Sequence, residues 1–141
     1  MSKNKLKLSP SALSCNFFNP SPQLTALENA GIDWIHLDVM DGVFVPNISF
    51  GQVVIKSLRK SAKSFFDVHL MITDPIRYID DFVNAGSDLI TVHAEACDDV
   101  RAVLMKIRQS GKKAGLSVKP KTPVESVFEY LDLCDLVLIM T

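Results

Sequence analysis

The 141-residue sequence predicts an α/β fold built on a parallel sheet. Three observations predict it. Short apolar runs alternate with amphipathic stretches, proline and N-cap residues open those stretches, and glycines follow them where a left-handed C-cap fits. Strand–helix alternation of this kind implies right-handed crossovers between parallel strands. A doubly wound sheet and a β/α barrel both satisfy these observations, although no Gly-rich phosphate loop follows the first predicted strand.

The elements follow in order along the chain. The predicted strands are Leu8–Ser14, Trp34–Met40, Phe65–Met71, Leu89–Glu95, Ala114–Lys119 and Leu136–Thr141. Helix starts are predicted at Ser21-Pro22, at Asp74-Pro75 and at Thr122–Glu125, which has capping-box spacing. Helix ends are predicted at Gly31, Gly86 and Gly111. Because 48% of the residues are hydrophobic, we expect residues 1–141 to form a single domain with a sizeable core.

Composition excludes several classes of function. The net charge of −1 gives no sign of a nucleic-acid partner. No segment approaches the roughly 18 apolar residues of a membrane span, and no long apolar run follows Lys3, Lys5 and Lys7 at the start, so neither a membrane nor a signal peptide is expected. Three scattered cysteines without a CxxC pair indicate a reduced, cytoplasmic protein.

Charged residues interrupt the predicted strand in the stretch IHLDVMDG, residues 35–42. Side chains alternate along a strand, so His36, Asp38 and Met40 share the face opposite Ile35, Leu37 and Val39. The stretches FFDVHLM and LITVHAE, residues 65–71 and 89–95, divide in the same way. A barrel explains the pattern, because its apolar faces pack outward on helices and its polar strand ends crowd the carboxyl-terminal mouth, where barrel active sites lie.

Three polar residues are expected to converge at this mouth: His36, Asp38 and His69. Two imidazoles and a carboxylate suit one divalent transition metal such as zinc, iron(II), manganese or cobalt. The alternative is that each is a hydrogen-bonded core residue without a ligand. His93 and Glu95 are better explained as residues that hold the metal ligands in place than as catalytic residues.

Five further residues have simpler explanations. Lys119 fits a surface lysine at a strand end better than a catalytic lysine. Met40 and Met71 fit core packing or the lining of a pocket, because they lie on the inward face. Asp41-Gly42 is typical of a turn.

The motifs resemble one known family. HLDVMDGVFVPNISFG, residues 36–51, is very similar to the signature of ribulose-phosphate 3-epimerases. The supporting pieces come in that family's order: PSALS at 10–14, DVHLM at 67–71, TVHAEA at 91–96, VKPKTP at 118–123 and LVLIMT at 136–141. The resemblance implies a (β/α)8 TIM barrel and a metal-assisted isomerase of the pentose phosphate pathway. Such an enzyme interconverts D-ribulose 5-phosphate and D-xylulose 5-phosphate through an enediolate, using one divalent metal ion.

The resemblance also implies roles for individual residues. His36, Asp38 and His69 match metal ligands, and Asp38 matches one of two acid/base carboxylates. Ser11 and His69 match substrate-binding residues, and the pocket-lining residues are Met40, Met71 and Met140. The expected partners are a small sugar phosphate and further copies of the same chain in a homo-oligomer.

The chain departs from the family at its end. The family takes its second acid, and a fourth metal ligand, from an aspartate on a seventh strand, whereas this sequence ends at Thr141, after the sixth predicted strand. We therefore expect a barrel truncated to about five and a half βα units, the amino-terminal part of a longer enzyme.

Two other functions stay open at this stage: a 3-epimerase of a six-carbon ketose phosphate such as allulose 6-phosphate, and a non-catalytic half-barrel if 141 residues are the whole product. The length of the reading frame past Thr141 separates the half-barrel from the enzymes. The metal residues do not separate the two sugars.

Overall fold

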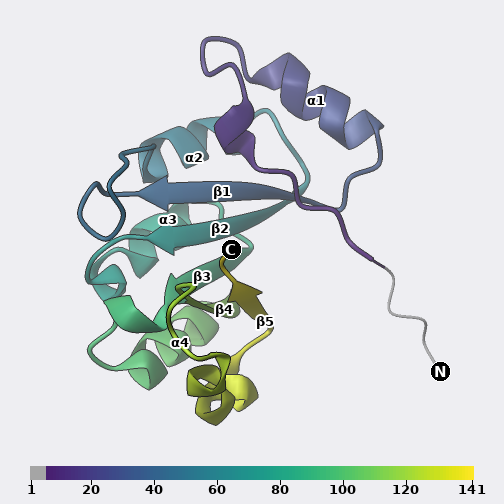
Figure 1. Ribbon diagram of the computed structural model, residues 1–141. Helices are drawn as coiled ribbons and strands as arrows, with labels where there is room; N and C mark the ends of the chain where they lie inside the picture. Colours follow the sequence, from purple (N-terminus) through teal and green to yellow (C-terminus); the bar gives the residue numbers. More distant parts are fainter. Residues whose placement is uncertain (1–5) are drawn as a thin grey trace, which may run out of the picture.

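The computed structural model describes residues 6–141 and shows a five-stranded parallel sheet in the order β1-β2-β3-β4-β5 (Figure 1). Its strands are β1 Trp34–Met40, β2 Phe65–Met71, β3 Leu89–His93, β4 Lys113–Val118 and β5 Leu136–Ile139. Its helices are η1 Ala12–Ser14, α1 Ser21–Asn29, α2 Gln52–Arg59, η2 Pro75–Arg77, α3 Ile79–Ala85, η3 Ala94–Ala96, α4 Val100–Gln109 and η4 Val124–Leu133, where η marks a 3-10 helix. Lys3 and Lys5, used above to judge the start of the chain, lie outside the described residues.

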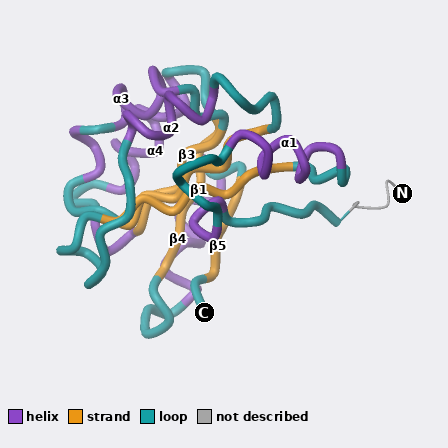
Figure 2. Tube along the Cα trace, turned by 90° about the horizontal axis from the view of Figure 1, so that it is seen from above, coloured by secondary structure: helices purple, strands orange, loops and turns teal. Residues whose placement is uncertain are grey.

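The sheet curls, and helices α2, α3 and α4 gather on its outer face (Figures 1 and 2). Helix α1 lies at the β1 end of the sheet. The outward side chains of β1 (Ile35, Leu37 and Val39) are buried in the apolar core, together with Leu24 of α1 and Ile55 of α2. The predicted division of β1 into an apolar and a polar face is confirmed, and the fold is the curled part of a β/α barrel rather than a doubly wound sheet.

The prediction of a strand over Leu8–Ser14 is wrong. This segment runs beside β1 and makes one isolated parallel bridge, between Ser11 and His36, before η1 begins. The carbonyls of Leu8 and Pro10 accept hydrogen bonds from the main chain at Trp34 and His36. Pro10 has no N–H to donate, so the ladder cannot continue on both sides.

The three predicted helix starts lie within one residue of the observed ones, but none of the predicted side-chain caps forms. The Ser21 hydroxyl donates to the Ser61 hydroxyl, at 2.9 Å, and Pro20 is the N-cap of α1. The Thr122 hydroxyl donates to Glu95, and η4 begins after Pro123 without a side-chain cap. Asp74 is the N-cap residue of η2 and Pro75 is its first residue, as predicted, but the φ of Asp74 is 49° and its side chain makes no capping hydrogen bond.

The predicted helix ends and central strands are accurate. Gly31, Gly86 and Gly111 have φ angles of 78°, 100° and 78°, so each adopts the left-handed conformation that was predicted. Strands β1 and β2 have the predicted bounds. Strand β3 is shorter than predicted because η3 follows His93 directly, and β5 ends at Ile139.

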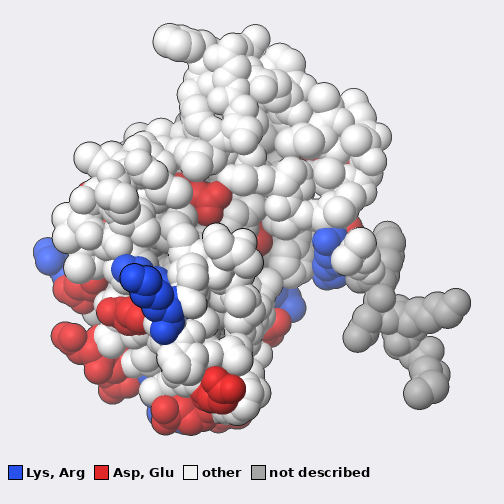
Figure 3. All heavy atoms as spheres, in the orientation of Figure 1, with Lys and Arg blue, Asp and Glu red and all other residues white. Residues whose placement is uncertain are grey.

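Charged side chains are unevenly distributed over the surface. In the view of Figure 3 they gather over the half of the molecule that holds α3, α4 and η4, while the half formed by η1 and α1 has few. Among the described residues, no helix is both long enough and apolar enough to cross a membrane.

Candidate metal centre

The register of β1 and β2 brings the predicted polar residues together. Asp38 of β1 is directly opposite His69 of β2, and His36 is directly opposite Asp67. Residues opposite each other in a sheet point to the same face, so all four side chains meet on the inner face of the curled sheet. They lie toward the carboxyl ends of the strands, the end at which barrel enzymes place their chemistry.

Asp38 stands at the centre of this group. Its Oδ1 lies 3.1 Å from His36 Nε2 and 3.2 Å from His69 Nδ1. Its Oδ2 accepts a hydrogen bond from the Ser11 hydroxyl at 2.5 Å. One donor atom from each of His36, Asp38 and His69 lies within 4.8 Å of the other two. We call these three residues the His–Asp–His cluster.

Asp67 is a functional candidate that the sequence reasoning missed. Its Oδ2 accepts hydrogen bonds from His36 Nδ1, at 2.7 Å, and from the Ser9 hydroxyl, at 3.1 Å. A carboxylate on the far nitrogen of an imidazole fixes the ring and the position of its proton, so that Nε2 of His36 faces the cluster. Asp67 is two residues before His69 in DVHLM, and that shared face was the available signal.

His93 and Glu95 support His69 in a similar way. His93 Nε2 lies 2.8 Å from His69 Nε2, and His93 Nδ1 lies 3.3 Å from Glu95 Oε2. Because Glu95 accepts the Nδ1 proton, the Nε2 of a neutral His93 carries a lone pair that accepts the Nε2 proton of His69. The other ring nitrogen of His69, Nδ1, faces Asp38 Oδ1 at 3.2 Å.

The electrostatics of the cluster follow from burial and these bonds. Burial favours the neutral form of His36, but the hydrogen bonds and charges of Asp38 and Asp67 outweigh it and raise the pKa of His36 to about 9. Burial likewise opposes ionisation of Asp38, yet the bonds from His36, His69 and Ser11 hold its pKa well below the usual range. Burial and the nearby His69 lower the pKa of His93 to about 4.

The donor set fits a metal ion. His69 Nδ1 and Asp38 Oδ1 share a hydrogen bond at 3.2 Å, on the side of the ring that faces away from His93. A cation bound by both atoms would take the place of the proton between them. Two imidazole nitrogens and one carboxylate oxygen are donors that zinc, iron, manganese and cobalt accept in proteins.

The other predicted site residues are placed around this cluster. Met40 and Met71 are opposite each other at the ends of β1 and β2, on the face of Asp38 and His69. Met140 is half-buried and follows β5. Asp41 begins the predicted turn, since its Oδ1 accepts the N–H groups two and three residues later and Gly42 has a φ of 78°.

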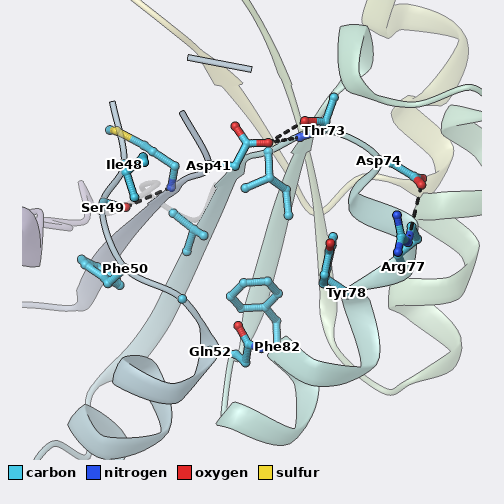
Figure 4. Close-up of a pocket in the computed structure, with 14 residues that line it drawn as sticks. Asp41, Ile48, Ser49, Phe50, Gln52, Thr73, Asp74, Arg77, Tyr78 and Phe82 are labelled. Carbon is cyan, nitrogen blue, oxygen red and sulfur yellow. Dashed lines mark hydrogen bonds and ion pairs between the residues drawn. The ribbon is translucent and has the colours of Figure 1, made fainter. Parts of the chain in front are cut away.

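A separate cavity of about 500 Å³ opens beside the cluster, between the loop after β1 and the start of α3 (Figure 4). Phe82 and Tyr78 face it from one side. Asp41 and Thr73 lie near one another at its edge, where the main chain and hydroxyl of Thr73 both donate to Asp41 Oδ2. His36, Asp38 and His69 are not among its lining residues, so this cavity is distinct from the cluster.

The curled parallel sheet, the outer helices and a polar cluster at the strand ends place this molecule in the class of β/α-barrel proteins with a candidate metal centre. A sequence model described as the ribulose-phosphate 3 epimerase family matches residues 7–141. The chain belongs to this family, as its motifs predicted.

Individual relatives agree. The chain is 46% identical over 143 aligned positions to the ribulose-phosphate 3-epimerase of Synechocystis sp., covering 100% of this chain and 62% of that protein. It is 47% identical to the enzyme of Treponema pallidum, covering 95% of this chain and 62% of that protein. It is 44% identical to the chloroplastic ribulose-5-phosphate-3-epimerase of Arabidopsis thaliana, covering 99% of this chain and 50% of that protein. The chain thus spans half to about three fifths of the length of these relatives.

Proposed function

We propose that the protein is a ribulose-phosphate 3-epimerase that interconverts D-ribulose 5-phosphate and D-xylulose 5-phosphate. The observation that carries the proposal is the convergence of donor atoms of His36, Asp38 and His69 within 4.8 Å of one another, in a chain whose relatives bear that enzyme's name. Two imidazole nitrogens and a carboxylate oxygen are a donor set that divalent transition metals accept in proteins. This donor set suits an enzyme that binds a cation between the three residues.

His36 Nε2, Asp38 Oδ1 and His69 Nδ1 would hold the metal. When bound, a divalent ion acts as a Lewis acid that stabilises negative charge developing on the sugar as a carbon next to the ketone loses its proton. Asp67 and His93 fix the orientation of the two imidazoles through their outer nitrogens. Metal analysis of the purified full-length protein would identify the ion among zinc, iron(II), manganese and cobalt.

Asp38 would also accept the substrate proton. Its low pKa keeps the carboxylate ionised at neutral pH, and Oδ2 is the oxygen that the two histidines leave for this task. The hydroxyl of Ser11 reaches the same oxygen, so Ser11 is placed to orient the carboxylate and to contact the sugar. Met40, Met71 and Met140 would line the pocket.

Inversion needs a second acid that returns a proton to the opposite face of the carbon. By resemblance to the family, this is an aspartate on a seventh strand, in the part of the relatives that the chain does not span. The single domain over residues 1–141, the cytoplasmic location and the homo-oligomer remain predictions. Light scattering of the purified full-length protein measures the last of these.

The proposal is tested with the full-length protein, freed of metal with a chelator and then resupplied with each candidate ion. We expect conversion of D-ribulose 5-phosphate to D-xylulose 5-phosphate that is lost with the metal and restored by its return. Faster turnover of D-allulose 6-phosphate would instead assign the six-carbon substrate. A metal-loaded protein inactive on both sugars would overturn the proposal.

A further inference from the structure

The loop that follows β1, residues 43–48, is closed at its base by bonds of its own. Asp41 Oδ1 accepts hydrogen bonds from the N–H groups of Val43 and Phe44, at 2.9 and 2.8 Å. An isolated antiparallel bridge joins Asp41 to Ile48. Val43 and Ile48 are 76% and 82% exposed, so their side chains do not anchor the loop to the sheet.

The loop is fastened to the rest of the molecule through Phe44. Lys119, 75 residues away at the end of β4, donates a hydrogen bond from Nζ to the Phe44 carbonyl at 3.0 Å. The same ammonium lies 3.6 Å from the centroid of the Phe44 ring, within the range of a cation–π interaction. Within residues 6–141, the bond from Lys119 to the Phe44 carbonyl is the hydrogen bond that joins loop 43–48 to the end of a distant strand.

The fastening places an aromatic ring against the histidines of the site. The Phe44 ring and the His93 imidazole have centroids 4.8 Å apart, and His93 in turn stacks on His69 with centroids 5.0 Å apart. His93 is fully buried, although it lies near the open end of the sheet. Phe44 therefore forms part of the cover that keeps water from the supporting histidine.

The main chain of Lys119 is held by the same group of residues. Its N–H donates to Glu95 Oε1 at 2.7 Å, while the other oxygen of Glu95 lies 3.3 Å from His93 Nδ1. Lys119 is therefore held at both its main chain and its side-chain ammonium. It is more constrained than the surface lysine that the sequence predicted. Lys119 is in fact half-buried.

We propose that Lys119 is a positioning residue that holds loop 43–48 closed over His93, acting through Phe44 rather than on the substrate. A closed loop excludes water from a site in which a carbanion-like intermediate must be reprotonated by the enzyme alone. The effect of water exclusion on turnover rests on the proposed epimerase function. The closure of the loop by Lys119 does not depend on that function.

The loop itself is tested by hydrogen–deuterium exchange of the metal-free full-length protein. A hydrogen bond from a charged donor together with a cation–π contact is strong enough that Lys119→Met should speed exchange of the peptide containing residues 43–48 about tenfold. Lys119→Arg, which keeps charge and donors, should restore most of the protection. Lys121→Met, an exposed lysine of the same segment, is the matched control and should leave the peptide unchanged. Equal exchange in Lys119→Met and the wild type would overturn the proposal.

Kinetics of the metal-loaded protein test the route of action. We expect Lys119→Met to lower kcat about tenfold with little change in KM, because a residue that contacts the substrate phosphate would raise KM instead. Phe44→Leu keeps the carbonyl but removes the ring, and the double variant should lose less than the product of the two single losses. Fully independent losses, or a change confined to KM, would show that Lys119 acts elsewhere. An inactive wild type would remove the proposed function while leaving the exchange result intact.

Discussion

The two faces of strand β1 are both largely shielded from water, but different interactions stabilise each face in the folded protein. On the outer face, Ile35, Leu37 and Val39 are 0%, 0% and 4% exposed and pack in the apolar core. On the inner face, His36 and Asp38 have side chains that are each 15% exposed, and every one of their polar atoms has a partner. The outer face is stabilised by the area it buries, and the inner face by specific pairing.

This difference determines which substitutions each face tolerates. An apolar position tolerates another side chain of similar volume, because burial has no direction. A paired polar position does not, because a single changed atom leaves its buried partner unsatisfied. Substitutions on the two faces should therefore damage different properties of the protein.

The largest effect is expected from Asp38→Asn on the inner face. The amide cannot accept a substrate proton and is a poorer metal ligand, so kcat should fall at least about a thousandfold while the protein stays folded. Turnover is measured on the full-length protein with metal resupplied, with Leu37→Met on the outer face of the same strand as the control. Near-native turnover of the Asp38 variant would remove this carboxylate from the mechanism.

The outer face gives the opposite pattern. Leu37→Ala removes a fully buried side chain and should lower the free energy of unfolding by about 2–5 kcal/mol, measured by chemical denaturation. Metal affinity below the unfolding transition should stay within about twofold of the wild type, since no polar partner is lost. A variant that lost metal while remaining fully stable would break the distinction between the faces.

Asp67→Asn tests whether the supporting carboxylate belongs to the site. An amide holds His36 less firmly and makes its imidazole a weaker ligand, so metal affinity should fall about 10–100-fold with little loss of fold. Ser9→Ala, which removes the other hydrogen-bond donor to Asp67, is the matched control and should change affinity far less. An unchanged affinity in Asp67→Asn would limit the site to the cluster alone.

The smallest effect is expected at Glu28, where pairing occurs near the surface. Glu28 Oε1 accepts from the main chain of Lys63 and from both donors of Ser64, and these bonds outweigh burial and lower its pKa. A lowered carboxyl pKa adds stability above the unfolded-state pKa, and that stability is lost as pH falls through the folded-state pKa. Glu28→Gln should therefore be modestly less stable than the wild type at neutral pH, with the difference shrinking in acid. A difference independent of pH would contradict this assignment.

The sequence predicted the outer face better than the details of the inner face. The alternation in β1 and β2 determined both strands and which side faces the core, because period-two patterning is a local property. The convergence of His36, Asp38 and His69 followed from the same alternation. The bonds of Asp67 to His36 and of Lys119 to Phe44 depend on strand register and on loop path, which link residues 31 and 75 positions apart.

Two errors in the prediction have different origins. The segment Leu8–Ser14 was predicted as a strand from its short apolar run, but Pro10 has no N–H to donate and the segment makes a single bridge to β1. Thr122 had the spacing of a capping box, but Glu95 lay close enough to take its hydroxyl instead. The first error overlooked a local property of proline, and the second overlooked a tertiary partner.

The measurement that tests the central claim most directly is calorimetric titration of a divalent metal, zinc or manganese, into the metal-free full-length protein. We expect close to one ion per chain and, because the pKa of His36 is about 9 in the metal-free state, release of about one proton near pH 7, seen as a dependence of the heat on the buffer. Affinity should rise as pH approaches 9, and His69→Ala should abolish the site. Tight binding that persists in His69→Ala, or no binding by the wild type, would contradict a metal centre built from His36, Asp38 and His69.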